Sequence, residues 1–306
     1  MSYSPPKLSP AERTLIHARK LAKWAREKKQ LLLEPERKTH KFMVAEKLRK
    51  FGNTPQMINF DRCGNDIIEC WCKGCSHVKK FTYQCNRKWC PNCNWKITKA
   101  RAEVVGVWAE HVKQPKHLVL TMRNFPKLTT EKIREFQKAL LALRRQDVFD
   151  TVAGGCCSIE ITNAGEGWHL HSHLLVDVRW LDMEAISIAW GKLVNQEFGI
   201  VKIKDVRGKS YLHEVTKYVA KGSELAAWTA EQLHEFVTSI KGRRFFFQFG
   251  SLLKMRPEIM REIARRKPPP KECECGCSEF YYLTEEESQM DECGLYNHHR
   301  RRRRAS

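Results

Sequence analysis

Long apolar runs are missing from this chain of 306 residues. A membrane-spanning helix needs roughly 20 consecutive apolar residues, so none is expected. The first ten residues also lack the apolar core of a secretion signal, which favours a cytoplasmic protein. Acidic residues are scarce beside basic ones: 35 Asp and Glu stand against 55 Lys and Arg, for a net charge of +20. This excess favours a nucleic-acid partner over a membrane surface, with a merely basic, solvated surface as the alternative.

Internal repeats are absent too, so the chain is divided by composition alone. Apolar residues make up 42%, which predicts that most of the chain folds. A proline run at 268–270 marks a linker. The expected parts are a basic helical N-terminal region at 1–60, a Cys-rich zinc-binding module at 61–95, a main domain at 96–266, and a Cys- and Arg-rich tail at 267–306.

The zinc module is predicted from the spacing of its cysteines. In a reducing cytoplasm, thirteen cysteines are expected to be thiols or metal ligands rather than disulfides. The segments Cys72-Lys-Gly-Cys75 and Cys90-Pro-Asn-Cys93 form two CxxC knuckles, and four such thiolates suit tetrahedral Zn²⁺. Three further cysteines leave the exact set of four open, namely Cys63, Cys70 and Cys85.

Basic side chains lie on and just after this module. Arg87, Lys88 and Lys96 are the candidates for contact with DNA phosphates, and the neighbouring Trp89 either stacks on bases or belongs to the core. The C-terminal cysteines, Cys273, Cys275, Cys277 and Cys293, could form a second zinc site with His298 and His299, but their CxCxC spacing suits tetrahedral zinc poorly. A flexible tail with spare thiols is therefore expected there, and its closing arginine run predicts phosphate binding.

Hydrophobic periodicity predicts an α+β fold, with an antiparallel sheet and helices packed on it. A turn-like linker, NAGEGW, predicts that the second and third strands form a hairpin. Strands are expected at 116–122, 155–163, 169–178 and 200–206, followed by a short apolar run, FFFQFG. Helices are expected at 11–33, 95–112, 129–149, 182–197, 211–221 and 224–240.

One expected strand carries three alternating histidines, His169, His171 and His173. Alternate residues of a strand share one face, so the three imidazoles project together. Imidazoles held on a rigid strand can bind a divalent cation, and a carboxylate can complete the site. Glu160, on the other strand of the expected hairpin, is the candidate carboxylate. The alternative is a polar strand with surface histidines.

A later helix carries Glu214, Tyr218 and Lys221 at positions i, i+4 and i+7. These positions share one helix face. A phenol, a carboxylate and an ammonium in one row could perform phosphoryl transfer, with the phenolate as nucleophile and the carboxylate activating water. Taken alone, this triplet is more often ordinary helix surface. Tyr211, seven residues before Tyr218, lies on the same face.

Taken together, these motifs resemble the HUH endonucleases, and specifically the rolling-circle replication initiators (Rep) of small Gram-positive plasmids. The resemblance covers about 85–222 and is carried, in the family's order, by CNRKWCPNCNW, HLVLTMRN, SIEITNAGEGWHLHSHLLV and EVTKYVAK. Two positions depart from the family pattern: Leu170 stands where Pro is frequent, and Ser172 stands where an apolar residue is usual.

The resemblance implies an HUH endonuclease domain at 96–266 that nicks one strand of origin DNA. It implies His171 and His173 as the pair that binds Mg²⁺ or Mn²⁺, Tyr218 as the nucleophile that becomes a 5′-phosphotyrosine, and Glu214 as the water-activating carboxylate. Lys221 is then expected near the metal or the scissile phosphate. Because some HUH enzymes use two tyrosines, the resemblance also makes Tyr211 a second candidate nucleophile. The implied partners are single-stranded and duplex origin DNA, a host helicase and a host DNA polymerase that extends the 3′-OH.

Two other functions remain open at this point. An HUH-type transposase or relaxase carries similar motifs and would cut a different DNA site. A non-enzymatic zinc DNA-binding repressor would bind the origin without cutting it.

Overall fold

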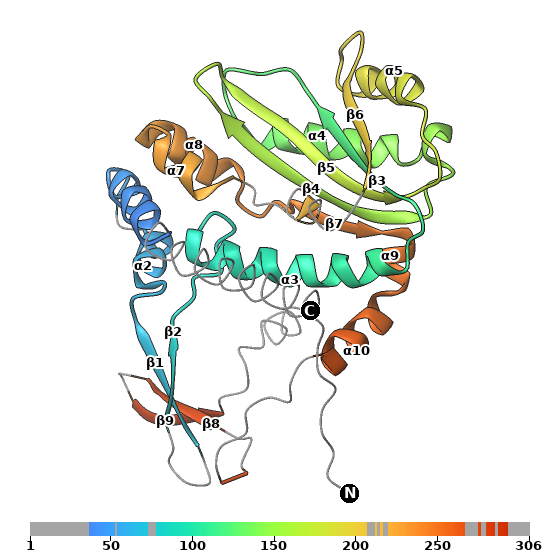
Figure 1. Cartoon of the computed structure of the whole chain (residues 1–306). Coiled ribbons are helices and arrows are strands. Elements are labelled where there is room, and N and C mark those ends of the chain that lie inside the picture. The colour runs from blue at the N-terminus through green and yellow to red at the C-terminus, as the bar shows by residue number, and fades with distance from the viewer. Residues whose placement is uncertain are drawn as a thin grey trace, which may run out of the picture.

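The computed structural model describes residues 37–52, 54–72, 78–206, 212, 215–216, 220–266, 275–276, 280–284 and 287–292. The protein has the predicted α+β architecture. A large antiparallel sheet lies between two groups of helices, and a smaller sheet lies beyond one end of α3 (Pro91–Glu110) (Figure 1). No helix among these residues is long and apolar enough to cross a membrane. The expected helix at 11–33 lies outside the described residues.

The large sheet has the strand order β6-β3-β5-β4-β7, and all its neighbours are antiparallel. Its strands are β3 (Pro115–Thr121), β4 (Gly154–Asn163), β5 (Trp168–Asp177), β6 (Ile200–Asp205) and β7 (Phe246–Phe249). The predicted hairpin of β4 and β5 is present, with Glu160 opposite His171. Its turn needs glycine at position 167, where φ is +93° and a Cβ would lie 2.7 Å from the Phe125 carbonyl oxygen.

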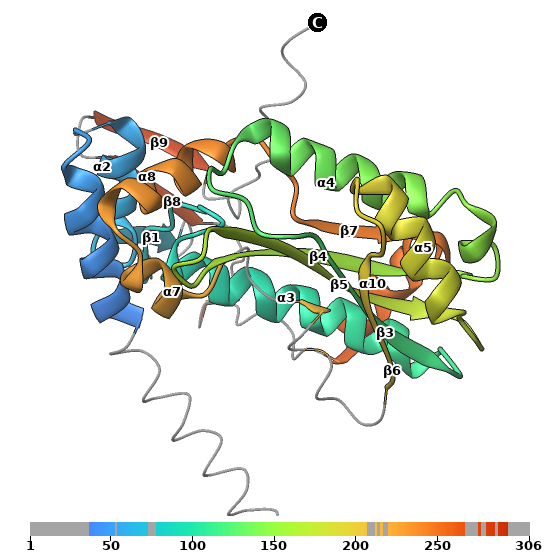
Figure 2. The ribbon, with the colours of Figure 1, turned by 90° about the horizontal axis from the view of Figure 1, so that it is seen from above.

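One face of this sheet supports the main core. Alternate residues of the central strands point to this face and are buried: Leu118, Leu120, Ile159, Ile161, Leu170 and Leu174. The helices that cover it are α4 (Thr130–Leu143), α5 (Met183–Leu193) and α8 (Ala230–Ser239), and Figure 2 shows α4 and α5 lying over the strands. Ser172 also points to this face, and its hydroxyl donates to the Leu120 carbonyl at 3.5 Å.

The opposite face is covered by α3 and α10 (Arg256–Arg266). Val105 and Trp108 of α3 pack with Cys156 and Leu175 of the sheet in a second buried cluster. The short helix α9 (Gly250–Lys254) joins β7 to α10 and adds Leu252 to that cluster. The histidines of β5 project from this same face, because residues two apart in a strand share a side.

The second sheet joins segments from both ends of the described chain. Its order is β2-β1-β8-β9, with β1 (Ile67–Cys72), β2 (Val78–Thr82), β8 (Phe280–Thr284) and β9 (Glu287–Glu292). Helix α2 (Pro55–Arg62) and a helix over residues 37–49 precede this sheet in the chain. The region expected to be a flexible tail therefore contributes two strands to a sheet with β1.

Two expected helices differ from the observed ones. The helix expected at 129–149 ends at Leu143 and is followed by a short 3-10 helix, η1 (Asp147–Phe149). The helix expected at 224–240 is two helices, α7 (Gly222–Ala227) and α8, broken at Trp228. The break occurs because Thr229 starts α8 with a capping box, in which Thr229 and Gln232 bond each other's backbone N–H groups.

Candidate metal centre

Glu160, His171 and His173 meet on the sheet face that the histidine strand was expected to present. A Glu160 carboxylate oxygen lies 2.9 Å from His171 Nε2 and 3.4 Å from His173 Nε2. The three side chains come from the β4–β5 hairpin, whose register fixes them side by side. Their ligand atoms all lie within 4.8 Å of one another, so this group could hold a metal ion.

The polar atoms of this group fit a divalent cation. The side chain of Glu160 is 3% exposed and that of His173 is 7% exposed. His173 Nε2 is buried and makes no hydrogen bond to the described residues. Burial of the Glu160 carboxylate is costly without a cation nearby, and burial of the His173 Nε2 atom is costly because this atom makes no hydrogen bond to the described residues. Two imidazoles and one carboxylate form a donor set suited to a divalent metal.

His169, the first of the three histidines, makes a different contact. Its Nδ1 lies 2.7 Å from the Asn124 side-chain oxygen, and its ring centroid lies 5.4 Å from that of His171. Burial, followed by the neighbouring His171, lowers the pKa of His169. His169 therefore lies beside the metal-ligand group without belonging to it.

His117 of β3 is a neighbour of the group that the sequence did not single out. Its Nε2 lies 3.1 Å from His173 Nδ1, and the two rings stack with centroids 5.3 Å apart. β3 pairs with β5 so that Val119 faces His173, which makes His117 a diagonal neighbour on the same side of the sheet. A contact of this kind orients a metal-binding imidazole and fixes its tautomer.

A second carboxylate, Glu224 of α7, approaches the metal-ligand group from outside the sheet. Burial, followed by the Glu160 carboxylate, raises the pKa of Glu224, and His171 acts in the opposite direction. One Glu224 oxygen is buried without a hydrogen bond, and the other lies 3.8 Å from Lys221 Nζ. Lys221, the lysine expected near the phosphate, is thus paired with Glu224, whose charge interacts with those of Glu160 and His171.

Helix α7 is held in this position from several sides. Trp228, at its C-terminal end, donates from its indole N–H to the Asn163 carbonyl of β4 at 3.1 Å. Lys47 donates to the carbonyls of Ala226 and Trp228. At its start, a Cβ on Gly222 would lie 3.7 Å from Pro91, the first residue of α3.

Glu214, Tyr218 and Tyr211 lie outside the described residues. Two described residues close to them in the sequence, Val215 and Ala220, are buried. Val215 packs into the second cluster with Cys156 and Leu175, and Ala220 belongs to the main core.

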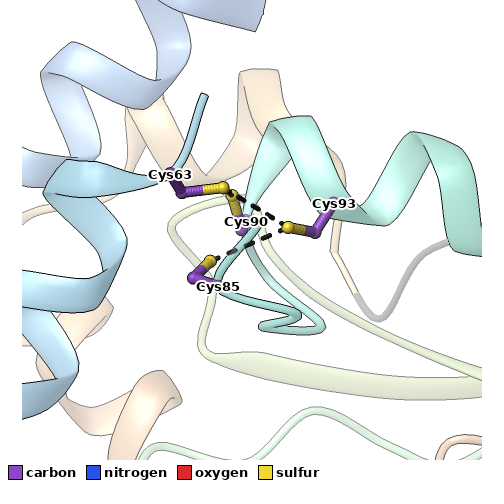
Figure 3. Close-up of side chains that lie close together, drawn as sticks. All are labelled: Cys63, Cys85, Cys90 and Cys93. Carbon is purple, nitrogen blue, oxygen red and sulfur yellow. Dashed lines mark hydrogen bonds between the residues drawn. The ribbon is translucent and has the colours of Figure 1, made fainter. Parts of the chain in front are cut away.

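Four cysteines form a second group that could hold a metal ion, Cys63, Cys85, Cys90 and Cys93 (Figure 3). Their Sγ–Sγ distances are 3.6 Å for Cys63–Cys90, 3.4 Å for Cys63–Cys93 and 3.8 Å for Cys85–Cys93. Four sulfurs around zinc, each about 2.3 Å from the ion, lie about 3.8 Å apart. The backbone N–H of Asn86 also donates to Cys93 Sγ at 3.2 Å.

The charges of these thiols also favour a cation. Hydrogen bonding from Cys85, then from the other two thiols, lowers the pKa of Cys63, whereas hydrogen bonding with Cys63 raises the pKa of Cys85 and Cys90. Against the raising effect of Cys63, hydrogen bonding from Cys85 and Cys90 leaves the pKa of Cys93 lowered, so without an ion the group favours thiolates at Cys63 and Cys93 at the expense of Cys85 and Cys90. A Zn²⁺ ion would stabilise all four.

This group differs from the expected set of zinc ligands. It contains Cys90 and Cys93 of that set, joined by Cys63 and Cys85, whereas Cys72 lies outside it. The reason is the β1–β2 hairpin: Cys63 and Cys85 flank its open end, where Ile67 pairs with Thr82. Cys72 lies five residues beyond Ile67 along β1, which places it about 17 Å from that open end at roughly 3.3 Å per residue. Cys75 lies outside the described residues.

The residues of this module that were expected to contact DNA differ in how exposed their side chains are. Lys96 is exposed on α3. Lys88 is half-buried and donates to the Arg243 carbonyl, with its ammonium 5.7 Å from the centre of the Phe245 ring. Burial lowers its pKa. Arg87 is partly exposed, whereas Trp89 is 4% exposed and packs on Phe60 as part of the core.

One of three comparisons with known proteins identifies a family for this chain. No curated protein and no solved structure matches the chain. A family model described as a replication protein, Rep_1, matches residues 77–300, which is well over half of the chain and includes the whole large sheet. The chain therefore belongs to the Rep_1 family of replication proteins.

Proposed function

We propose that this protein initiates rolling-circle replication by nicking one strand of origin DNA and forming a 5′-phosphotyrosine. The observation that supports this most strongly is the buried group of Glu160, His171 and His173, with its ligand atoms within 4.8 Å of one another. A replication protein that carries a divalent-metal site of this kind is suited to phosphodiester chemistry on DNA.

The proposed nucleophile is Tyr218. Its phenol oxygen forms a bond to the phosphorus, and the bond from phosphorus to the 3′ oxygen breaks. The phenol loses its proton, and the released 3′ oxygen gains one, leaving a 3′-OH that a polymerase can extend. Mg²⁺ or Mn²⁺ bound by Glu160, His171 and His173 would polarise the scissile phosphate.

Charged side chains around the phosphate are assigned by their position. Lys221 is proposed to stabilise negative charge on the phosphate oxygens. Glu224 would hold the Lys221 ammonium near the metal group through the 3.8 Å contact between them. Glu214 is proposed to accept a proton from water in the terminating hydrolysis, in which water attacks phosphorus and the tyrosine oxygen leaves.

The remaining parts of the chain are proposed to serve DNA binding. The zinc module would present Arg87, Lys88 and Lys96 to phosphates, with Lys88 contributing less because of its contact with Arg243. The net charge of +20 supports binding of both duplex and single-stranded origin DNA. The protein is proposed to act in the cytoplasm, with a host helicase and polymerase.

Nicking of a supercoiled plasmid that carries the replicon's origin tests this function. Conversion to open circles is expected with Mn²⁺ and purified protein, confined to one strand of the origin, and none is expected with EDTA. A plasmid without the origin is the control. Tight binding of the origin without any cutting would support a repressor instead, and cutting confined to transposon ends would support a transposase.

A further inference from the structure

Cys72, excluded from the first cysteine group, has another partner. Its Sγ lies 3.6 Å from that of Cys275, although the two residues are 203 apart in the sequence. Cys72 is 1% exposed and ends strand β1. Strand β8 pairs with β1 in a register that places Phe280 opposite Cys72. The pairing of the two strands thus brings the C-terminal cysteine segment to the end of β1.

The distance between these sulfurs matches the geometry of zinc thiolates. It equals the Cys63–Cys90 separation of 3.6 Å in the first group. It is also close to the edge of about 3.8 Å expected between two sulfurs on one tetrahedral zinc ion. A disulfide, with sulfurs about 2.05 Å apart, has a much shorter separation.

Further thiols are available close to both residues in the sequence. Cys72 begins a CxxC knuckle that ends at Cys75, and Cys275 is flanked at two residues by Cys273 and Cys277. These three lie outside the described residues. Gly276 has a φ of +76°, so the chain turns immediately after Cys275 in a conformation that glycine favours.

We propose that Cys72 and Cys275 are ligands of a second zinc ion, distinct from the one suited to Cys63, Cys85, Cys90 and Cys93. Thiolate ligands at tetrahedral spacing select Zn²⁺ over the Mg²⁺ or Mn²⁺ of the histidine group. This zinc would join β1 to the segment that leads into β8, and so hold β8 and β9 in the small sheet. The site does not depend on the nicking activity.

Zinc analysis of the full-length protein, purified under reducing conditions, tests the proposal. The wild type is expected to carry about two zinc ions per chain, because each site binds one. Cys72→Ser and Cys275→Ser should each lower the content to about one, and the double variant should lower it no further. Cys157→Ala, which changes a buried β4 thiol that belongs to neither cysteine group, is the control and should keep both ions. Cys85→Ser should lose the other zinc, so adding Cys275→Ser to it should leave none.

Two further measurements guard against loss of folding in the variants. Titration of zinc-free wild type with Co²⁺ should build thiolate-to-cobalt absorption up to two equivalents, and Cys275→Ser should stop at one. Hydrogen exchange should show weaker protection of β8 amides in Cys275→Ser, with β4 and β5 unchanged. A wild type with one zinc, two zinc ions retained in Cys275→Ser, or a Cys72–Cys275 disulfide in the reduced protein would each overturn the proposal.

Discussion

His117 Nε2 lies 3.1 Å from His173 Nδ1, on the side of the His173 ring opposite the Glu160 carboxylate. His173 can therefore bind a cation through Nε2 while its Nδ1–H donates to His117. The contact fixes both the tautomer and the orientation of a metal-ligand imidazole, which is the usual effect of a hydrogen-bonded neighbour on such a ligand.

Removing this support should weaken metal binding. We expect His117→Ala to lower the affinity for Mn²⁺ by about 10–100-fold, as loss of such partners does in other metal sites. His117→Gln can still accept from Nδ1–H and should lose less. Calorimetric titration with Mn²⁺ measures this, with His111→Ala, an exposed histidine on the far end of α3, as the control. Equal affinity in His117→Ala and wild type would contradict the positioning role.

Glu224 should have opposite effects with and without metal. Burial and Glu160 raise its pKa, so in the metal-free protein its charge costs stability in full above that raised pKa, and the cost declines as pH falls from it towards the ordinary pKa of the unfolded chain. Glu224→Gln should therefore raise the melting temperature of the metal-free protein at neutral pH. It should also reduce the further rise that Mn²⁺ produces, because a negative charge near the cation is lost.

Thermal melts with and without Mn²⁺ measure both effects. The exposed Glu197→Gln is the control and should change neither. If Glu224→Gln lowers the melting temperature of the metal-free protein, the electrostatic coupling to Glu160 is not the dominant effect at this position.

The corrected zinc ligands are tested by a pair of variants. Cys85→Ser removes a ligand and should release one zinc and lower the melting temperature, because zinc binding contributes directly to folding free energy. Cys85→His can still bind zinc, so it should keep most of the zinc content and a melting temperature close to that of the wild type. Pro91 of α3 lies close to the start of α7, since a Cβ on Gly222 would lie 3.7 Å from it, so Cys85→Ser should also weaken Mn²⁺ binding. Full zinc content in Cys85→Ser would exclude Cys85 from the site.

The sequence was sufficient for the parts of the fold that depend on local pattern. Strict alternation and a glycine-containing turn predicted the β4–β5 hairpin, and the hairpin alone brings Glu160 opposite His171. The break before α8 also had a local signal, the capping-box pair Thr229 and Gln232, beside an apolar periodicity that runs across it.

Long-range pairing explains what the sequence could not provide. His117 reaches His173 only because β3 is the neighbour of β5, a matter of strand order. Glu224 reaches the site through the packing of α7. Both CxxC spacings indicated zinc, but the choice of ligands depended on which end of the β1–β2 hairpin each cysteine occupies. Spacing along the chain carries no information on that.

The histidine pair should be required for cutting and dispensable for binding. His171→Ala combined with His173→Ala removes both imidazoles from the metal group, so nicking of origin plasmid should fall to background. Duplex binding, which we propose depends on the net positive charge, should persist within a few-fold in a mobility-shift assay. His169→Ala is the control, because His169 contacts Asn124 and lies outside the metal-ligand group. Nicking by the double variant at the wild-type rate would remove this group from the mechanism.

Mapping of the covalent adduct tests the central claim most directly. Purified protein is incubated with labelled single-stranded origin DNA and Mn²⁺, digested, and the DNA-bearing peptide is sequenced by mass spectrometry. The DNA is expected on Tyr218; Tyr218→Phe should abolish the adduct, and Tyr211→Phe should leave it largely intact. DNA attached to Tyr211, or strand cutting without any covalent adduct, would contradict the proposed mechanism.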